Sequence, residues 1–73
     1  MEPTLGDRIR AARALRKMSQ GALADDLREH GCASSVPQIS RWESGSAVPD
    51  ARQIARLVEL FGWDAGEALR WVV

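Results

Sequence analysis

The sequence predicts an all-α fold, and three features of it support that prediction. Apolar residues recur at helical spacing, and no segment alternates between apolar and polar residues over the length of a strand. Glycines and prolines such as Gly31, Pro49 and Gly62 fall between the periodic segments instead of within a strand ladder. With 73 residues, 45% of them hydrophobic, the chain has the size and composition of one small globular domain spanning residues 1–73. We therefore expect five short helices around one core.

The first helix is expected over residues 4–16, because Thr4 can cap its start and Asp7 occupies the capping-box position. Its apolar inner face is expected to consist of Leu5, Ile9 and Ala12, and either Leu15 or Arg16 would extend it. The second helix is expected over residues 19–30, with Ser19 as its cap and Gly31 as its end.

The third helix is expected over residues 35–44, from a cap at Ser35 to a stop at Gly45. Ile39 and Trp42 stand three residues apart and therefore share one face. So short a helix is not stable alone in water, so neighbouring helices must hold it through that face. Its other face stays free to contact another molecule.

The fourth helix is expected over residues 50–61 and the fifth over residues 64–72, with Asp50 and Asp64 as caps and Gly62 between them. The spacing of apolar residues predicts which side chains face the core: Ile54, Leu57, Val58 and Phe61 in the fourth helix, and Ala68, Leu69 and Val72 in the fifth.

The residues that catalysis or metal binding requires are scarce. The chain has one His, one Cys and no Tyr, and it lacks both a glycine-rich phosphate loop and paired metal-ligand spacing. We therefore expect no enzyme, no catalytic residue, no cofactor and no metal site, and we expect Cys32 to be a small buried or half-buried thiol. No apolar run is long enough to span a bilayer and no signal peptide is evident, which predicts a cytoplasmic protein with no membrane partner.

The formal net charge is zero, which by itself counts against nucleic-acid binding. The charges are unevenly distributed, however. Residues 1–17 hold five arginine or lysine residues and two acids, whereas further acids cluster at Asp25, Asp26 and Glu29. This asymmetry gives weak support to an anionic partner, because most charge runs are simply solvated helix faces.

Five segments carry a resemblance to a known family. They are L-G-D-R-I-R-A-A-R (5–13), M-S-Q-G-A-L-A-D-D-L (18–27), Q-I-S-R-W-E-S-G (38–45), V-P-D (48–50) and W-D-A-G-E-A-L (63–69). Together they resemble the Cro/repressor-type (XRE-like) helix-turn-helix domains of phage and bacterial transcription regulators. The resemblance implies a lambda-repressor-like five-helix domain that binds double-stranded DNA and regulates transcription, as a Cro/C1-type repressor does.

The resemblance also implies roles for individual residues. The third helix would lie in the major groove as the recognition helix. The implied DNA contacts are at the start of the second helix, along the third and just after it: Gln20, Ser35, Val36, Pro37, Gln38, Ser40, Arg41, Ser44 and Ser46. Arg41 could pair with guanine, whereas Val36 and Pro37 offer only apolar contacts. Simple capping is an equally good explanation of Gln20 and Ser35. Arg13 and Glu43 match a partly buried ion pair of the family that orients the recognition helix.

One departure from the family pattern and two alternatives stay open. Eleven residues separate Leu27 from Ile39, more than the family has, so the extra R-E-H-G-C must lengthen the second helix or enlarge the connection. The alternative function is a protein-interaction module on the same fold, such as an antitoxin or a partner-binding regulator. A homodimer is expected to use the C-terminal residues Trp71, Val72 and Val73, unless this end merely packs on the first helix.

Overall fold

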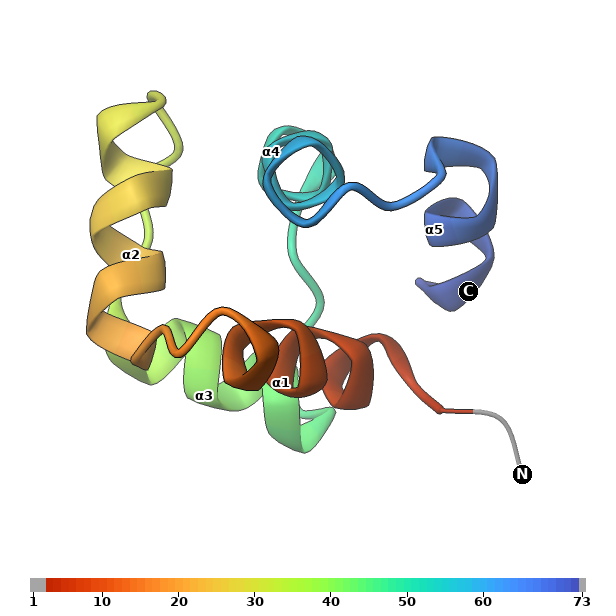
Figure 1. The fold of residues 1–73 in the computed structure, drawn as a ribbon, viewed down its shortest axis with the longest axis horizontal. Helices are drawn as coiled ribbons and strands as arrows, with labels where there is room; N and C mark the ends of the chain where they lie inside the picture. Colours follow the sequence, from red (N-terminus) through yellow and green to blue (C-terminus); the bar gives the residue numbers. More distant parts are fainter. Residues whose placement is uncertain (1–2, 73) are drawn as a thin grey trace.

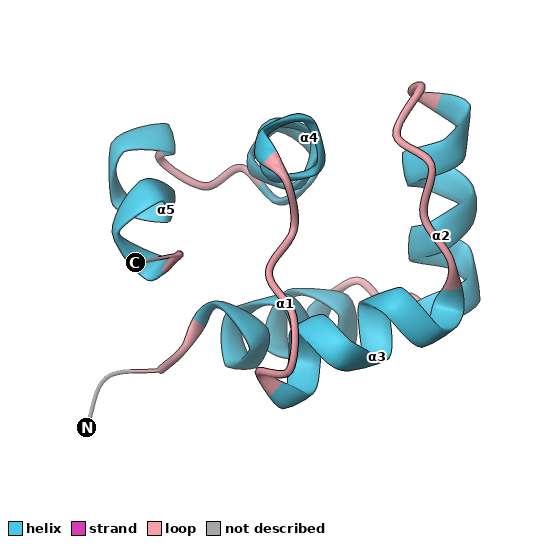
Figure 2. Cartoon of the chain, turned by 180° about the vertical axis from the view of Figure 1, so that it is seen from behind, coloured by secondary structure: helices cyan, strands magenta, loops and turns pink. Residues whose placement is uncertain are grey.

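The computed structural model describes residues 3–72, which form five α-helices joined by short connections. The helices are α1 (Leu5–Leu15), α2 (Gln20–Glu29), α3 (Val36–Ser44), α4 (Ala51–Phe61) and α5 (Ala65–Trp71). No strand occurs within the described range, so the predicted all-α fold class is confirmed. α1 lies alongside α3, while α2 and α5 stand at opposite ends with α4 between them (Figures 1 and 2). No helix in residues 3–72 is both long and apolar enough to cross a membrane.

The predicted caps start the helices. The Thr4 hydroxyl accepts a hydrogen bond from the Asp7 amide and the Asp7 carboxylate accepts one from the Thr4 amide, both at 3.1 Å. The other four starts are capped by the side chains of Ser19, Ser35, Asp50 and Asp64. Because a cap lies just outside its helix, each helix begins one residue after the start of the expected range.

The core joins all of α1 to α4. Its members are Leu5, Ile9, Leu23, Ala24, Leu27, Cys32, Ile39, Trp42 and Leu57. The prediction that Leu15 extends the inner face of α1 is wrong, because Leu15 is 86% exposed. Arg16 instead lies over the Phe61 ring, at 5.8 Å. Helical geometry explains the difference, since Arg16 is two full turns beyond Ile9 whereas Leu15 is rotated towards solvent.

The apolar residues of α4 and α5 are only partly buried. Leu57 is fully buried, but Ile54, Val58 and Phe61 are intermediate. Ala68 is fully buried whereas its neighbour Leu69 is 60% exposed, so the prediction that Leu69 faces the core is wrong. Adjacent helical residues point about 100° apart, and only one of these two can face inward.

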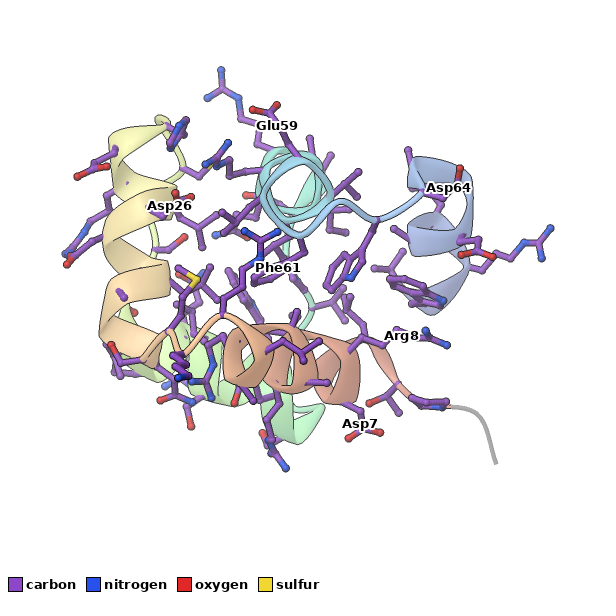
Figure 3. The ribbon with its side chains drawn as sticks, in the orientation of Figure 1. Asp7, Arg8, Asp26, Glu59, Phe61 and Asp64 are labelled. Atoms are coloured by element: carbon purple, nitrogen blue, oxygen red, sulfur yellow. The ribbon has the colours of Figure 1, made fainter. Side chains whose placement is uncertain are left out.

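The C-terminal end packs against the rest of the domain. Trp71 meets Trp63 edge-on at 5.1 Å, and the guanidinium of Arg8 lies 4.1 Å above the Trp71 ring. Figure 3 shows Arg8 on the side of α1 that faces α5. Val72 also packs against the core. Trp71 and Val72 thus pack within the domain while each stays partly exposed, and Val73 lies outside the described residues.

Gly6 brings α1 and α3 into backbone contact. A Cβ atom at this position would lie 2.4 Å from the Trp42 carbonyl oxygen and 2.7 Å from that of Glu43. Real Cβ atoms do not approach other atoms so closely, so only glycine fits where the two helices cross. This contact fixes the C-terminal half of α3 against the start of α1.

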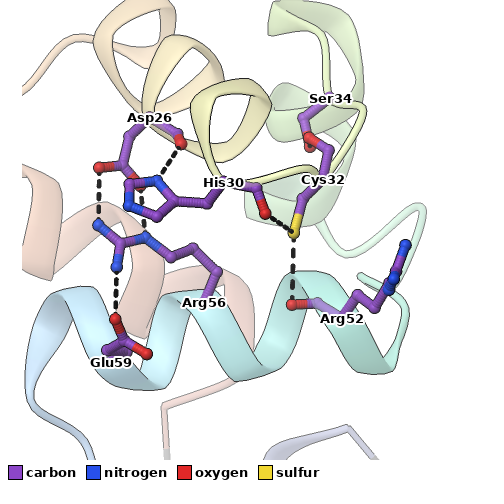
Figure 4. A network of polar contacts seen from close by, with 7 residues as sticks. All are labelled: Asp26, His30, Cys32, Ser34, Arg52, Arg56 and Glu59. Carbon is purple, nitrogen blue, oxygen red and sulfur yellow. Dashed lines mark hydrogen bonds and ion pairs between the residues drawn. The ribbon is translucent and has the colours of Figure 1, made fainter.

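The extra residues before α3 form a connection that is fastened to α4. α2 ends at Glu29, and residues 30–35 then lead to α3 through a left-handed Gly31, with φ of 79°. The Gln53 amide nitrogen donates to the Ala33 carbonyl and to the Ser34 hydroxyl, both at 3.2 Å. The Cys32 thiol is directed at the Arg52 carbonyl oxygen, 3.6 Å away (Figure 4). Most of the extra length therefore enlarges the connection, and α4 holds it in place.

Candidate nucleic-acid interface

The inner face of α3 is held tightly and its outer face is free. Ile39 and Trp42 are buried, at 0% and 2% exposure, as the sequence predicted. Ser35 caps the helix by accepting a 3.3 Å hydrogen bond from the Gln38 amide. The outward side is formed by exposed residues, with Gln38 half-buried beside them: Val36, Pro37, Ser40 and Arg41. Within residues 3–72 the guanidinium of Arg41 makes no ion pair, so its donors are available to a ligand.

Glu43, which is buried, connects α3 to α1 through an ion pair with Arg13. Arg13 donates two hydrogen bonds to the Glu43 carboxylate, from Nε to Oε2 at 2.6 Å and from Nη2 to Oε1 at 3.0 Å. Its remaining terminal nitrogen, Nη1, donates to the Met18 carbonyl at 2.8 Å. The side chains of Arg13 and Glu43 are only 16% and 3% exposed. This buried two-pronged pair therefore fixes α3 relative to α1 and to the start of α2.

The electrostatics of this pair keep Glu43 ionised. Burial alone would raise the pKa of the Glu43 carboxyl. Hydrogen bonds from Arg13 and Gln20, together with the charges of Arg13 and Arg10, outweigh burial and hold that pKa below its usual value. The hydrogen bond to Glu43 correspondingly raises the pKa of Arg13.

Gln20, a predicted phosphate contact, belongs to the same cluster. Its amide nitrogen donates to Glu43 Oε1 at 3.2 Å, and the side chain is half-buried. Gln20 is also the first residue of α2, where free amides and the helix dipole favour an anion. The cap of α2 is Ser19, so the simple-capping alternative does not describe Gln20.

The C-terminal end of α3 presents two hydroxyl groups. Gly45 adopts a left-handed conformation, with φ of 84°, and ends the helix. Ser44 donates to the Arg41 carbonyl at 3.1 Å, and its hydroxyl lies 2.9 Å from that of Ser46. All nine residues implied as DNA contacts thus lie on α3, at its two ends or against Glu43.

A second, partly buried ion pair fixes α2 against α4. Arg56 donates from Nε and Nη2 to the two oxygens of Asp26, at 2.8 and 2.9 Å, and from Nη1 to Glu59 at 2.9 Å. Figures 3 and 4 show Asp26 on the side of α2 that faces α4. Hydrogen bonding from Arg56 holds the pKa of Asp26 below its usual value, although burial opposes that shift.

The sequence did not point to four of the residues that build this arrangement: Gly6, Arg10, Gln53 and Arg56. A glycine inside a helical pattern destabilises the helix relative to alanine, so Gly6 could have been singled out as a residue with a packing role. Arg56 meets an acid thirty residues away, and no local pattern reveals such a partner. The same holds for Gln53, whose contacts in the connection lie about twenty residues back.

Two consecutive helices, α2 and α3, with the second held by its inner face and open on its outer face, define a helix-turn-helix unit. The chain matches the family of helix-turn-helix domains over residues 4–71 and belongs to that family. Membership indicates a DNA-binding domain and agrees with the resemblance to Cro/repressor-type domains. Domains of this kind are generally not enzymes. Comparison with curated proteins and with solved structures finds no match.

Proposed function

We propose that this domain binds double-stranded DNA in a sequence-specific manner and regulates transcription as a phage or bacterial repressor does, with α3 in the major groove. One feature carries most weight: Val36, Pro37, Ser40 and Arg41 on the outer face of α3 are exposed, while its inner face is fixed by Ile39, Trp42 and the Arg13–Glu43 pair. A recognition helix has to be rigid and accessible in this way to read base edges. The proposed partner is DNA, which implies a cytoplasmic protein.

Within this proposal, Arg41 is the main base-reading residue. Its exposed guanidinium has the donor geometry for a paired contact with a guanine edge. Val36, which is 42% exposed, and Pro37 supply apolar contact, for example to a thymine methyl group. The remaining proposed contacts are polar groups for backbone phosphates or neighbouring bases: Gln20, Ser35, Gln38, Ser40, Ser44 and Ser46.

The pairing of the acids explains how a chain of zero net charge can bind DNA. Glu43 is buried against Arg13, and Asp26 is occupied by Arg56, so neither carboxylate faces the outer side of α3 as a free charge. Arg41 and the surplus cations of α1 then set the local field. Local charge, more than the sum over the chain, determines phosphate contact.

A protein-interaction module on the same fold is the second candidate. The apolar start of α3, with Val36 and Pro37 exposed side by side, favours a protein partner such as the toxin of an antitoxin. This alternative predicts binding that depends little on salt, because few phosphate counterions would be released.

A homodimer is part of the proposal, because one domain makes few base contacts and two half-sites about 34–36 Å apart would add specificity. Trp71 and Val72 already pack against other residues of the domain. A dimer contact at the C-terminal end would therefore also have to involve the apolar surface beside them. Leu69, which is 60% exposed, lies on that surface. Analytical ultracentrifugation with and without DNA tests this point, and a monomer in every condition would exclude a dimer.

Selection from a random duplex library tests the proposed function. We expect enrichment of a short motif, and we expect Arg41→Ala to relax the preference at one base position at a cost of about 1–3 kcal/mol. Equal weakening on all sequences would reassign Arg41 to phosphate contact. Failure to enrich any duplex would contradict DNA recognition.

A further inference from the structure

We propose that Arg10, on α1, binds a DNA backbone phosphate beside Gln20 and so adds a contact that no motif of the sequence assigns. This inference rests on the proposed function, since it names a further residue of the same interface. It concerns the phosphodiester group of the duplex and carries no base preference.

The distance from Arg10 to Glu43 shows which part of the domain Arg10 lies in. Arg10 Nε lies 3.6 Å from Glu43 Oε1. The same oxygen accepts hydrogen bonds from Gln20 at 3.2 Å and from Arg13 at 3.0 Å. Arg10 therefore stands where α1, the start of α2 and α3 converge, next to the residue that the family resemblance assigns to phosphate.

The charge balance of this cluster leaves a surplus positive charge at Arg10. The single negative charge of Glu43 is already matched by Arg13, which holds it through two short hydrogen bonds in a buried site. At 3.6 Å, Arg10 is beyond hydrogen-bond distance from Glu43, and its side chain is 61% exposed. Two guanidinium groups thus share one carboxylate, and the surplus positive charge is on the exposed group.

The nearest acid on the same helix does not cancel that surplus through an ion pair. Asp7 lies one turn before Arg10, but its carboxylate accepts the Thr4 amide in the capping box (Figure 3 labels Asp7). No ion pair between Asp7 and Arg10 occurs within residues 3–72. Within the described residues no hydrogen bond engages the Arg10 guanidinium, and a guanidinium with available N–H donors is well suited to phosphate oxygens.

The start of α2 adds further positive potential beside Arg10. The first turn of α2 begins at Gln20 and directs the positive end of a ten-residue helix towards the same region. A phosphate placed there would meet the dipole of α2, the Gln20 amide and the Arg10 guanidinium together. A structural role for Arg10 is the competing explanation, and it makes a different prediction.

The test compares Arg10→Gln with Arg70→Gln, which makes the same charge change on α5, at the end of the molecule opposite α2 (Figure 1). Affinity for one selected duplex is measured over a range of salt concentrations. We expect the slope of log affinity against log salt to fall by about 0.9 in Arg10→Gln, the value for one lost phosphate contact, and to stay at the wild-type value in Arg70→Gln. Arg10→Lys should keep the wild-type slope, since it keeps the charge.

Three results separate the possibilities. An unchanged slope in Arg10→Gln would overturn the inference, and so would a loss of affinity with a lowered melting temperature and an unchanged slope, which would mark Arg10 as a residue that positions α3. If the wild-type protein bound no duplex at all, the proposed function itself would fail, and Arg10 with it. Thermal melting of all three variants, expected within a few degrees of wild type, completes the comparison.

Discussion

Replacing Gly6 with alanine tests the contact on which the position of α3 depends. The added Cβ would lie 2.4 Å from the Trp42 carbonyl oxygen, whereas carbon and oxygen in close contact stand about 3.3 Å or more apart. The obstructing atoms are backbone, so no side chain can turn away and one helix must move. Overpacking of this kind costs about 1–3 kcal/mol, and we expect the upper end of that range because two carbonyl groups obstruct the methyl group.

The assay is thermal unfolding followed by circular dichroism, with Gly21→Ala as the matched control. For a domain of this size each kcal/mol shifts the melting temperature by about 4–8 °C, so Gly6→Ala should lower it by roughly 12–24 °C. A Cβ at Gly21 would meet only the Ser19 hydroxyl, at 3.7 Å. Gly21→Ala should therefore be neutral or stabilising by up to about 1 kcal/mol. If Gly6→Ala melted at or above the temperature of the control, the close crossing of α1 and α3 would be refuted.

Four further predictions concern stability. Glu43→Ala leaves Arg13 buried without its partner and should cost about 3–5 kcal/mol in urea unfolding; a loss under 1 kcal/mol would contradict a buried pair. The folded-state pKa values of Glu43 and Asp26 are lowered, so their stabilisation is present above the unfolded-state values and should disappear as the pH falls through the acid range; stability that is flat from pH 6 to pH 3 would be inconsistent with both. Gln53→Ala removes the donor to the Ala33 carbonyl and should cost about 1–3 kcal/mol by calorimetry, and a neutral result would mean that α4 does not hold the connection. Lys17 has a left-handed φ of 54°, so Lys17→Gly should gain up to about 1 kcal/mol where Lys17→Ala gains none; equal effects would point to charge instead of backbone strain.

Local chemistry made the helices predictable. Thr4, Ser19 and Asp50 each cap a helix through their own side chain, and this preference can be read from a few adjacent residues. Ile39 and Trp42 were identified as buried because helical spacing places them on one face. The Arg13–Glu43 pair was reached only through the family resemblance, since nothing in its spacing indicates a contact across thirty residues.

The errors and omissions arose where tertiary geometry decides. Leu15 and Leu69 are apolar, yet the first is rotated away from the core at the end of its helix and the second is adjacent to the residue that is buried. Exposed leucines are common because a small domain cannot bury all of its apolar surface. Arg10 could not be singled out among the five cations of residues 1–17, because its surplus charge depends on which neighbour neutralises Glu43.

The two partly buried ion pairs have one consequence in common for the interface. Arg13–Glu43 fixes α3 to α1, and Asp26–Arg56 fixes α2 to α4, so both helices of the helix-turn-helix unit are tied to the scaffold by charged pairs. Because removing one partner of such a pair lowers the stability of the fold, the two helices are held in a rigid geometry. We expect little rearrangement of α2 and α3 on binding, which lowers the entropic cost of recognition.

Affinity for duplex DNA as a function of salt tests the central claim most directly. If α3 and its surroundings contact the DNA backbone, log affinity should fall linearly with log salt, by about 0.9 for each phosphate that the protein neutralises. A selected duplex should also bind more tightly than a random one at every salt concentration. Shallow salt dependence, or no binding to any duplex, would contradict DNA recognition and favour a protein partner for the outer face of α3.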